Sequence, residues 1–249
     1  MPANAVKQNV DTVKTSRHKP VMAAKSLEKR RKKSASTVAT QLKAAPAKRR
    51  AAPAAPYHHG DLHAALLQAA ETILERDGLG GLTLRAAARE AGVSHAAPTH
   101  HFGDMTGLLS DLAAAGFRKF GASMSAAAAT RTSAAERMDA MGEAYVTFAR
   151  EHPATFLLMF RSERLDHARP ALRQAMDEAF GLLTRGVIAQ RGSEVPSAPL
   201  AVIAEIAGAW SLVHGFAMLM IDHRLGNLLS HLPQGTGVQD LLRAVLRGR

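Results

Sequence analysis

The pattern of hydrophobic and polar positions changes at about residue 57, where an α-helical period begins. Apolar side chains then recur at i, i+4, i+7, i+8 and i+11, positions that share one face of an amphipathic helix. They are Leu62, Leu66, Ala69, Ala70 and Ile73. The pattern predicts a first helix whose apolar face belongs to a core.

Polar and glycine positions indicate where this helix and the next one begin and end. Asp61 is a favourable N-terminal residue, and Gly78 is a favourable stop. Thr83 predicts the N-cap of a short second helix over 84–91. Gly92 predicts the left-handed residue that ends this helix.

The next segment predicts a third short helix that starts near His95. Ser94 is positioned to cap it, and Pro98 falls in its first turn, where a missing N–H is tolerated. Phe102 closes the unit as a core residue. Two short helices joined by a glycine turn, with another helix packed behind, are typical of a helix-turn-helix, here over 60–102. The turn alone is only moderately specific, because many helical hairpins share it.

The rest of the chain also has a helical pattern, punctuated by prolines, with no strand-like alternation and no internal repeat. Further helices are expected at 104–126, 133–151, 153–161, 170–191, 199–223 and 237–247. The predicted fold class is all-α. A three-helix helix-turn-helix domain at 57–104 precedes a helical domain at 105–249, and a disordered basic tail at 1–56 precedes both.

Residues 1–56 carry the excess positive charge of the chain. This segment holds fourteen Lys or Arg and two acidic residues, a net +12, whereas the remainder holds eighteen and nineteen, a net −1. It has no aromatic residue and no apolar period, so it cannot bury enough surface to offset the entropy of ordering. It also lacks the apolar stretch of a signal peptide. A transit peptide, a solubilising tail and a phosphate-binding arm all stay open.

Candidate enzyme and metal chemistry is scarce. The chain has no cysteine, which excludes disulfides, thiolate metal sites and cysteine nucleophiles. No Gly-x-Ser-x-Gly, Walker or His-Glu-x-x-His motif is present, and a Ser-x-x-Lys match at Ser16 lies in the tail. His59 and His63 could share a metal, but no third ligand is evident. We expect no catalytic residue, no metal and no cofactor.

The segment 200–221 is long and apolar enough to span a membrane, with Glu205 as its only charged residue. However, Ala201, Gly208 and Gly215 repeat every seven residues, and such a stripe suits close packing between helices. A single late span without charge asymmetry is also a poor membrane design. We expect no membrane contact. Instead, we expect this helix to meet a second copy of the chain, with the final helix as the second dimer element.

Residues 58–109 also carry a family resemblance. The residues concerned are His58-His59-Gly60-Asp61-Leu62, Gly78, Leu82-Thr83-Leu84-Arg85, Ala88-Arg89-Glu90-Ala91-Gly92-Val93-Ser94, His101-Phe102 and Leu108-Leu109. In order and spacing this stretch resembles the TetR family of bacterial transcription regulators.

A second match lies downstream. Its residues are Glu151-His152-Pro153-Ala154, Met159-Phe160 and Ala209-Trp210-Ser211-Leu212-Val213-His214-Gly215. They are similar to the ligand-binding half of a subgroup marked by Trp-x-x-x-His-Gly. The basic tail has no counterpart in either match.

The resemblance implies a set of DNA contacts. The set is Thr83, Ser94, His95, Ala96, Thr99, His100 and His101. Thr83 and Ser94 would contact phosphates through hydroxyls and helix N-termini, although each also suits capping. His95, Ala96 and His100 would face base edges, or for the histidines simply solvent. His101 would lie on the DNA backbone.

Two departures from the family weaken the expected phosphate contacts. The family usually has Tyr at the place of Thr99 and Lys at the place of Met105. The segment 57–120 holds five Lys or Arg against seven acidic residues, so its own attraction to DNA should be weak. We hypothesise that the tail compensates, with Arg49 and Arg50 entering an adjacent minor groove.

The resemblance also implies a small, apolar effector among the C-terminal helices. The candidate residues are Met141, Phe148, Phe156, Met159, Phe160, Phe180, Trp210, His214 and Met218. Without the resemblance, most of them would be assigned to the core. Trp210 and His214 lie four residues apart on one helical face, so they could orient a polar end of the ligand or satisfy each other.

The combined prediction is a cytoplasmic, nucleoid-associated bacterial regulator that is not an enzyme. It would bind a palindromic operator in double-stranded DNA as a homodimer and respond to a ligand, with repression the commoner outcome in the family. A ligand would tilt the helix at 104–126 and change the spacing of the recognition helices. The alternative is a largely non-specific, nucleoid-type DNA-binding protein driven by the tail.

Overall fold

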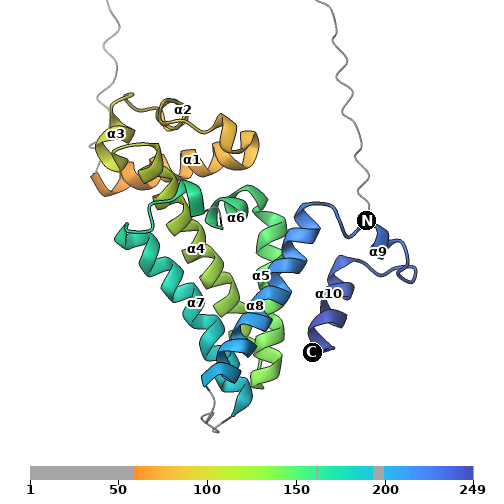
Figure 1. Cartoon of the computed structure of the whole chain (residues 1–249). Coiled ribbons are helices and arrows are strands. Elements are labelled where there is room, and N and C mark those ends of the chain that lie inside the picture. The colour runs from red at the N-terminus through yellow and green to blue at the C-terminus, as the bar shows by residue number, and fades with distance from the viewer. Residues whose placement is uncertain (1–58, 161, 193–198, 249) are drawn as a thin grey trace, which may run out of the picture. The chain divides into compact units, whose positions relative to one another are not determined.

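The computed structural model describes residues 59–160, 162–192 and 199–248, and every regular element in these ranges is helical (Figure 1). The elements are α1 (His59–Gly81), α2 (Leu84–Glu90), α3 (Ala97–Phe102), α4 (Met105–Ala129), α5 (Ala134–Glu151), α6 (Pro153–Met159), the 3-10 helix η1 (Ser162–Arg164), α7 (Pro170–Arg191), α8 (Pro199–Ile221), α9 (Gly226–Leu229) and α10 (Val238–Arg247). The all-α prediction, with an N-terminal helix-turn-helix and a C-terminal helical domain, is confirmed. The predicted tail lies outside the described residues.

Local hydrogen bonds explain where α2 begins and ends. The Thr83 hydroxyl accepts the backbone N–H of Ala86 at 3.0 Å, as a helix N-cap does. Gly92 has φ 68°, and the N–H of Val93 donates to the carbonyl of Ala88 at 2.9 Å. This six-to-one bond is the Schellman closure that a left-handed glycine permits. The predicted cap and stop of this helix are both confirmed.

The recognition helix α3 begins two residues later than predicted, at Ala97. Ser94 does not cap it with its side chain; its carbonyl accepts the N–H of Ala97 at 3.1 Å in a turn. Ala96 already has helical angles (φ −80°, ψ −22°), whereas a side-chain cap requires an extended residue. Pro98 lies in the first turn, and Phe102 is buried at the end, both as predicted.

Helix α1 packs its apolar face on α2, α4 and α6. Leu66, Ala70 and Ile73 of the predicted face are almost fully buried. The helical path breaks at Gly78, which has φ 69° and ψ −176°. The predicted period and stop therefore describe this helix correctly.

Helix α4 runs from the helix-turn-helix into the C-terminal half, where it contacts α5, α6 and α7 (Figure 1). Asp104 caps it by accepting the N–H of Gly107 at 2.8 Å. Its close approach to α6 depends on Gly116. A Cβ there would lie 2.8 Å from Cγ2 of Thr155 and 2.9 Å from Sδ of Met159. Helices α4 and α6 are therefore in direct van der Waals contact.

Helix α10 packs on α5, which corrects part of the dimer prediction. Leu242 and Leu246 are 0% and 1% exposed, so they serve the core of their own chain. Gly142 of α5 makes room for them, since a Cβ there would lie 3.0 Å from Leu246. An amphipathic helix buries its apolar stripe on the nearest matching surface, which here is intramolecular. Val238, Leu241 and Val245 of α10 are half-buried, and Ala244 is exposed.

Helix α8 is long and apolar enough to cross a membrane by length and composition alone, and 17% of its most apolar window is buried. Its inner side, including Val213, Phe216 and Ala217, is buried, and the helix contacts α5 and α7. Its outer side exposes apolar residues, among them Leu200 and Ile203.

The predicted small-residue stripe lies on this helix. Ala201 and Gly208 are exposed, and a Cβ added at Gly208 or Gly215 would meet nothing within 4 Å. The stripe therefore packs against no described residue of the chain itself.

Candidate DNA-binding surface and ligand cavity

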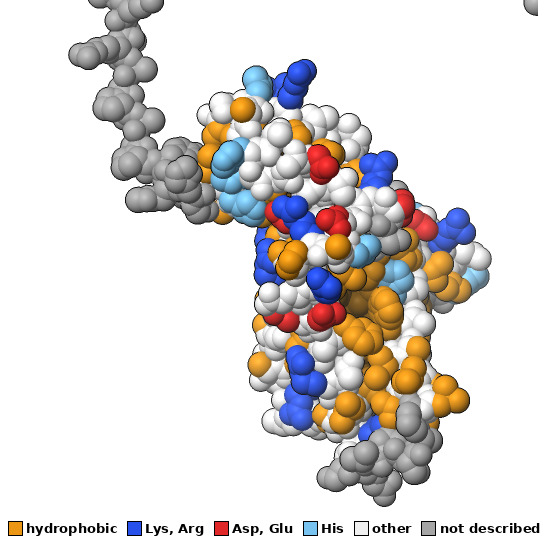
Figure 2. Space-filling view, turned by 60° about the vertical axis from the view of Figure 1, so that its left-hand side comes forward, with side chains coloured by type: hydrophobic (Ala, Val, Ile, Leu, Met, Phe, Trp, Pro, Cys, Tyr) orange, Lys and Arg blue, Asp and Glu red, His pale blue; other side chains and the backbone are white. Residues whose placement is uncertain are grey.

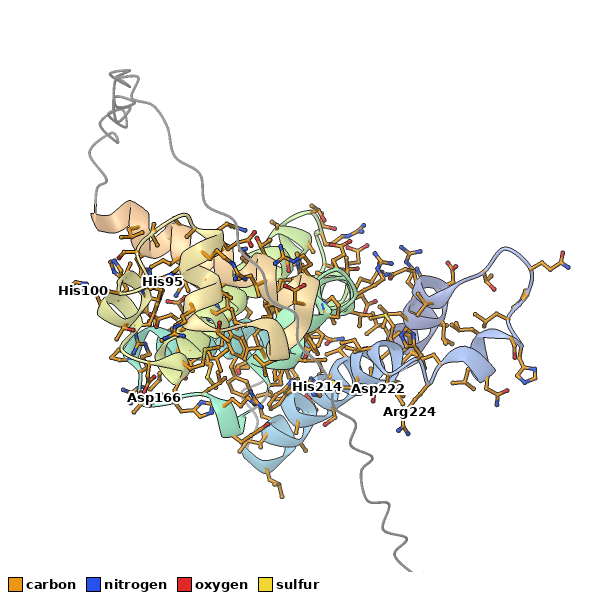
Figure 3. The ribbon with its side chains drawn as sticks, turned by 90° about the horizontal axis from the view of Figure 1, so that it is seen from above. His95, His100, Asp166, His214, Asp222 and Arg224 are labelled. Carbon is orange, nitrogen blue, oxygen red and sulfur yellow. The ribbon has the colours of Figure 1, made fainter. Side chains whose placement is uncertain are left out.

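The residues predicted to contact DNA gather on α2, α3 and the turn between them. Thr83, Ser94, His95, Ala96, Thr99 and His100 are exposed, and His101 is half-buried. His95 and His100 lie at the end of the described unit opposite α9 and α10, far from His214 (Figure 3). Arg49 and Arg50 lie outside the described residues.

Few positive charges are available on this surface. Arg76 and Lys119 are already paired with carboxylates, at N–O distances of 2.9 and 2.5 Å. Arg85 and Arg89 stand four residues apart on α2, are exposed, and have no ion pair with the described part of the chain. They were not among the predicted contacts. Two basic residues at i and i+4 on the helix before the turn could have indicated them as phosphate contacts.

Histidine rings connect the recognition helix to α1. The ring centroids of His100 and His101 are 5.4 Å apart, and those of His101 and His63 are 6.0 Å apart. His63 also packs on Phe102 at 4.9 Å. Figure 2 shows histidine side chains gathered on the upper part of this face. The ring of His63 thus supports the end of α3 from behind.

A buried carboxylate joins α1, α4 and the start of α7. Asp111 is 8% exposed; Nε of Arg169 donates to its Oδ1 at 2.5 Å, and Nη2 of Arg169 donates to its Oδ2 at 2.9 Å. His63 Nε2 lies 3.2 Å from Oδ2 of Asp111. Burial raises the pKa of Asp111, but the hydrogen bonds from Arg169 and His63 outweigh it and hold the pKa below its ordinary value. The carboxylate is therefore ionised at neutral pH.

Two further carboxylates on α1 reach the C-terminal half. Glu75 accepts the backbone N–H groups of Thr155 and Ala154 at 3.0 and 3.3 Å, so it caps the N-terminus of α6. Glu71 accepts from Nζ of Lys119 on α4. His63, Glu71 and Glu75 are spaced by eight and four residues and form one contact face of α1. No cluster of three potential metal ligands occurs among the described residues.

The C-terminal half contains a cavity of about 350 Å³ between α4, α5, α6, α7 and α8. Its lining residues are Phe117, Phe120, Met124, Met138, Met141, Gly142, Tyr145, Met159, Phe160, His167, Met176, Asp177, Ala179, Phe180, Leu183, Ala209, Trp210 and Val213. Hydrophobic side chains gather around a hollow in this face (Figure 2). Rings and thioethers dominate the wall, as in pockets for small apolar molecules.

The polar groups of Tyr145, Trp210 and His214 interact with one another. Oη of Tyr145 lies 2.9 Å from Nδ1 of His214, and the indole of Trp210 also interacts with this hydroxyl as a donor. Burial lowers the pKa of His214, so the ring is neutral at pH 7 and its Nδ1 can accept from the tyrosine. Burial raises the pKa of Tyr145, so the hydroxyl keeps its proton. Trp210 and His214 are thus satisfied chiefly through a third residue, Tyr145.

The predicted ligand residues divide into two groups. The cavity lining includes Met141, Met159, Phe160, Phe180 and Trp210. It does not include Phe148, Phe156, His214 and Met218. Phe148 and Phe156 are buried in the core, His214 is bonded to Tyr145, and Met218 packs against the core without reaching the cavity.

The predicted ligand residues included none from α4 and, from α7, only Phe180. Phe117 and Phe120 lie on α4, and Met176 and Asp177 lie on α7. A helical period shows which side of a helix is apolar, but it does not show which apolar sides leave a gap between them. Tyr145, the centre of the polar group, carried no motif that would have singled it out.

Two protein-family models match the chain. The model for bacterial regulatory proteins of the tetR family matches residues 66–112, and the model for the tetracyclin repressor-like C-terminal domain matches residues 138–246. The protein belongs to the TetR family. The predicted family is confirmed, whereas the subgroup marked by Trp-x-x-x-His-Gly stays a prediction.

Solved structures with the same fold agree with this assignment. A Rhodococcus sp. RHA1 protein with unknown function is 35% identical, with a TM-score of 0.62 over 78% of this chain and 97% of that one. The TetR family transcriptional regulator PfmR from Thermus thermophilus is 18% identical, with a TM-score of 0.51 over 73% and 97%. FadR from Bacillus subtilis, in complex with stearoyl-CoA, is 14% identical, with a TM-score of 0.56 over 74% and 96%. None of the curated protein sequences matches significantly.

This TetR-family protein is a transcription regulator with a DNA-binding helix-turn-helix and a ligand-binding C-terminal domain. Repression and homodimers are typical of the family, whose members are generally not enzymes. The comparisons give no support to the nucleoid-type alternative.

Proposed function

We propose that this TetR-family regulator is a ligand-responsive repressor that binds a palindromic operator as a homodimer. One observation carries the proposal: α4 and α6 contact the helix-turn-helix with one part of their surface and line the cavity with another. A molecule that prefers one packing of these helices would shift the position of the helix-turn-helix, because only differential affinity for two states can change their populations.

Two contacts of α1 would transmit the shift. Glu75 holds the N-terminus of α6, whose other end places Met159 and Phe160 at the cavity. Arg169 binds Asp111 two residues after the cavity residue His167, and Asp111 in turn contacts His63 behind the recognition helix. The cavity is thus one or two contacts away from the DNA-reading unit along both routes.

The exposed apolar side of α8 supports the homodimer. Leu200 is 78% exposed and Ile203 is 61% exposed, and Ala201, Ala204 and Gly208 between and beside them are also exposed. Burial of this side against its equivalent in a second copy would give a symmetric contact. A two-fold dimer is also what two half-sites about 34 Å apart require.

The DNA contacts would be divided by chemistry. Thr83 and Ser94 would contact phosphates, and the exposed Arg85 and Arg89 of α2 would contact further phosphates. His95 and His100 would contact base edges in the major groove. Ala96, Thr99 and His101 would complete the surface. Arg49 and Arg50 of the tail would add contacts in the minor groove.

The domain division and location follow from this role. We infer a basic tail at 1–56, a DNA-binding domain at 57–104 and a ligand-binding and dimerisation domain at 105–249. The protein would act in the cytoplasm, where its operator lies. Its effector would be a small, largely apolar molecule. FadR, which has the same fold, was solved in complex with stearoyl-CoA, so this fold can bind a ligand that carries a long apolar chain.

Selection of bound sequences from random DNA duplexes tests the proposal. The full-length protein would be compared with a variant that begins at Ala51, at two salt concentrations. We expect both to enrich the same palindrome, and the shorter variant to bind it with lower affinity and a smaller salt slope.

The alternative function predicts a different pattern. If neither protein enriches a sequence and only the full-length chain binds, the protein is a tail-driven, non-specific DNA binder. An operator-binding regulator should prefer its site by about a thousandfold or more over random DNA.

A further inference from the structure

Aromatic rings from four helices line the cavity. Phe117 and Phe120 come from α4, Tyr145 from α5, and Phe180 and Trp210 from α7 and α8. Phe180 and Trp210 are 50% and 41% exposed and meet edge to face at 6.2 Å, so they form the rim. The face of an aromatic ring carries negative potential, which attracts a cation within about 6 Å of its centre.

The ionisable residues of the wall add to this preference. Asp177 on α7 is the carboxylate of the lining, and neither Lys nor Arg lines the cavity among the described residues. Asp177 has no ion pair within the described part of the chain. The next residue, Glu178, is instead hydrogen-bonded to Gln174 at 2.8 Å. A negative group at the rim, with His167 and no Lys or Arg in the lining, favours a positive ligand over a negative one.

Tyr145, Trp210 and His214 offer no site for an anion. The hydroxyl of Tyr145 is used by His214, and the indole N–H of Trp210 is directed at the same hydroxyl. Burial lowers the pKa of His214, so the ring carries no positive charge at neutral pH. A carboxylate or phosphate beside these three residues would find neither a positive charge nor a free donor, and its desolvation there would be uncompensated.

From this arrangement we propose that the effector is a hydrophobic organic cation, held by the aromatic wall with its positive charge toward Asp177. The proposal rests on the ligand-responsive function proposed above and specifies the class of its ligand. Five methionine side chains of the lining are flexible and polarisable, so they would adapt to cations of different outline. By the same argument, fatty acids, acyl thioesters and other anionic amphiphiles should bind less tightly than a cation of similar shape.

The test uses two ions of nearly identical shape and opposite charge. Tetraphenylphosphonium and tetraphenylborate each carry four phenyl rings around a charged centre. Binding to the full-length protein is measured by calorimetry and by the emission of Trp210, the one tryptophan of the chain, which reports occupancy of the cavity. We expect the cation to bind at least about tenfold more tightly than the anion.

Two variants that remove one negative charge each serve as a matched pair. Asp177→Asn should weaken tetraphenylphosphonium several-fold and leave tetraphenylborate unchanged or tighter. Glu178→Gln, one residue along the same helix and outside the lining, should leave both affinities nearly unchanged. Circular dichroism of both variants would show that neither has lost its fold.

The outcomes separate this proposal from the proposed function. Equal or tighter binding of the anion, or no binding of either ion, overturns the cationic class. A cation preference that is undiminished in Asp177→Asn overturns the role of that carboxylate. If the cation binds but leaves operator affinity unchanged, the site stands and the ligand-responsive function fails. If a neutral or anionic molecule releases DNA, the function stands and the proposed class fails.

Discussion

Asp111 shows at the scale of single residues how a buried charge can hold separate parts of a chain together. Its two oxygens are shared between Arg169 and His63, and its side chain is largely removed from water. A depressed carboxyl pKa means that the folded state favours the ionised form more than the unfolded chain does. This contribution to stability is complete above the unfolded pKa of about 3.9 and is lost as the pH falls through the lower folded value.

Replacement of Asp111 by Asn should therefore destabilise the protein at neutral pH. We expect a loss of about 1–3 kcal/mol at pH 7, because Arg169 keeps its charge in a partly buried place without a counter-ion. The difference between wild type and variant should shrink below about pH 4. Urea unfolding at pH 7 and pH 3.5 measures it. Asp77→Asn, which breaks an exposed pair with Arg76, is the control and should change stability much less. A pH-independent difference would contradict this account.

Arg85 and Arg89 provide a second prediction at the residue scale. If they contact phosphates, replacement of either by Ala should lower the slope of log affinity against log salt by about one, for operator and random DNA alike. Arg118 is also exposed but lies on α4, outside the DNA-binding surface, so Arg118→Ala is the control. Fluorescence anisotropy titrations over a range of salt concentrations give the slopes. Equal slopes for all three variants would remove the pair from the interface.

The contact between α4 and α6 is decided at the scale of elements, by the absence of a side chain. Gly116 and Gly121 stand on the same helix, but a Cβ at Gly116 would overlap α6, whereas a Cβ at Gly121 would meet Leu182 at an ordinary 3.6 Å. Alanine is the better helix former by about 1 kcal/mol, so the two positions should respond with opposite signs.

Gly116→Ala should destabilise the protein by about 1–3 kcal/mol through overpacking against α6. Gly121→Ala should stabilise it by up to about 1 kcal/mol. Thermal and chemical unfolding of the two variants provide the comparison. A stabilising Gly116→Ala would mean that the helices are further apart than the structure indicates.

The cap that α1 places on α6 offers a prediction about dynamics. Loss of the Glu75 carboxylate leaves the first N–H groups of α6 without their acceptor. Glu75→Ala should raise amide hydrogen exchange in a peptide that covers 153–159. Glu71→Ala, which breaks the contact with Lys119 instead, should not. Unchanged protection of α6 in the Glu75 variant would remove this carboxylate from the proposed route between cavity and DNA.

The outer side of α8 belongs to the scale of the whole molecule, because no described residue of the chain covers it. We expect Ile203→Glu to convert a dimer into a monomer, since it places a charge in the apolar contact. Analytical ultracentrifugation measures the change. Ala126→Glu, on the exposed side of α4, should leave the dimer intact. A wild-type protein that stays monomeric at micromolar concentration would contradict the dimer itself.

Local signals made the helix-turn-helix predictable. The apolar period of α1, the hydroxyl of Thr83 and the left-handed Gly92 act over a few residues, so their consequences can be derived from neighbours in the sequence. The start of α3 was misjudged because Ser94 is a good capping residue by type, whereas a turn from Ser94 to Ala97 places Ala96, with helical angles, at the cap position. At this position the capping preference of the residue type and the observed course of the backbone differ.

The sequence by itself determined that the chain is helical, where most helices begin and end, and which family it belongs to, because these depend on periodicity, caps and motif spacing. Only the tertiary structure decided which apolar faces enclose a cavity, that Tyr145 joins Trp210 to His214, and that Asp111 and Glu75 link the two halves. The hydrogen bonds of Asp111 with His63, of Tyr145 with His214 and of Glu75 with Thr155 join residues 48, 69 and 80 positions apart. Their partners are chosen by the packing of whole helices, which no local pattern encodes.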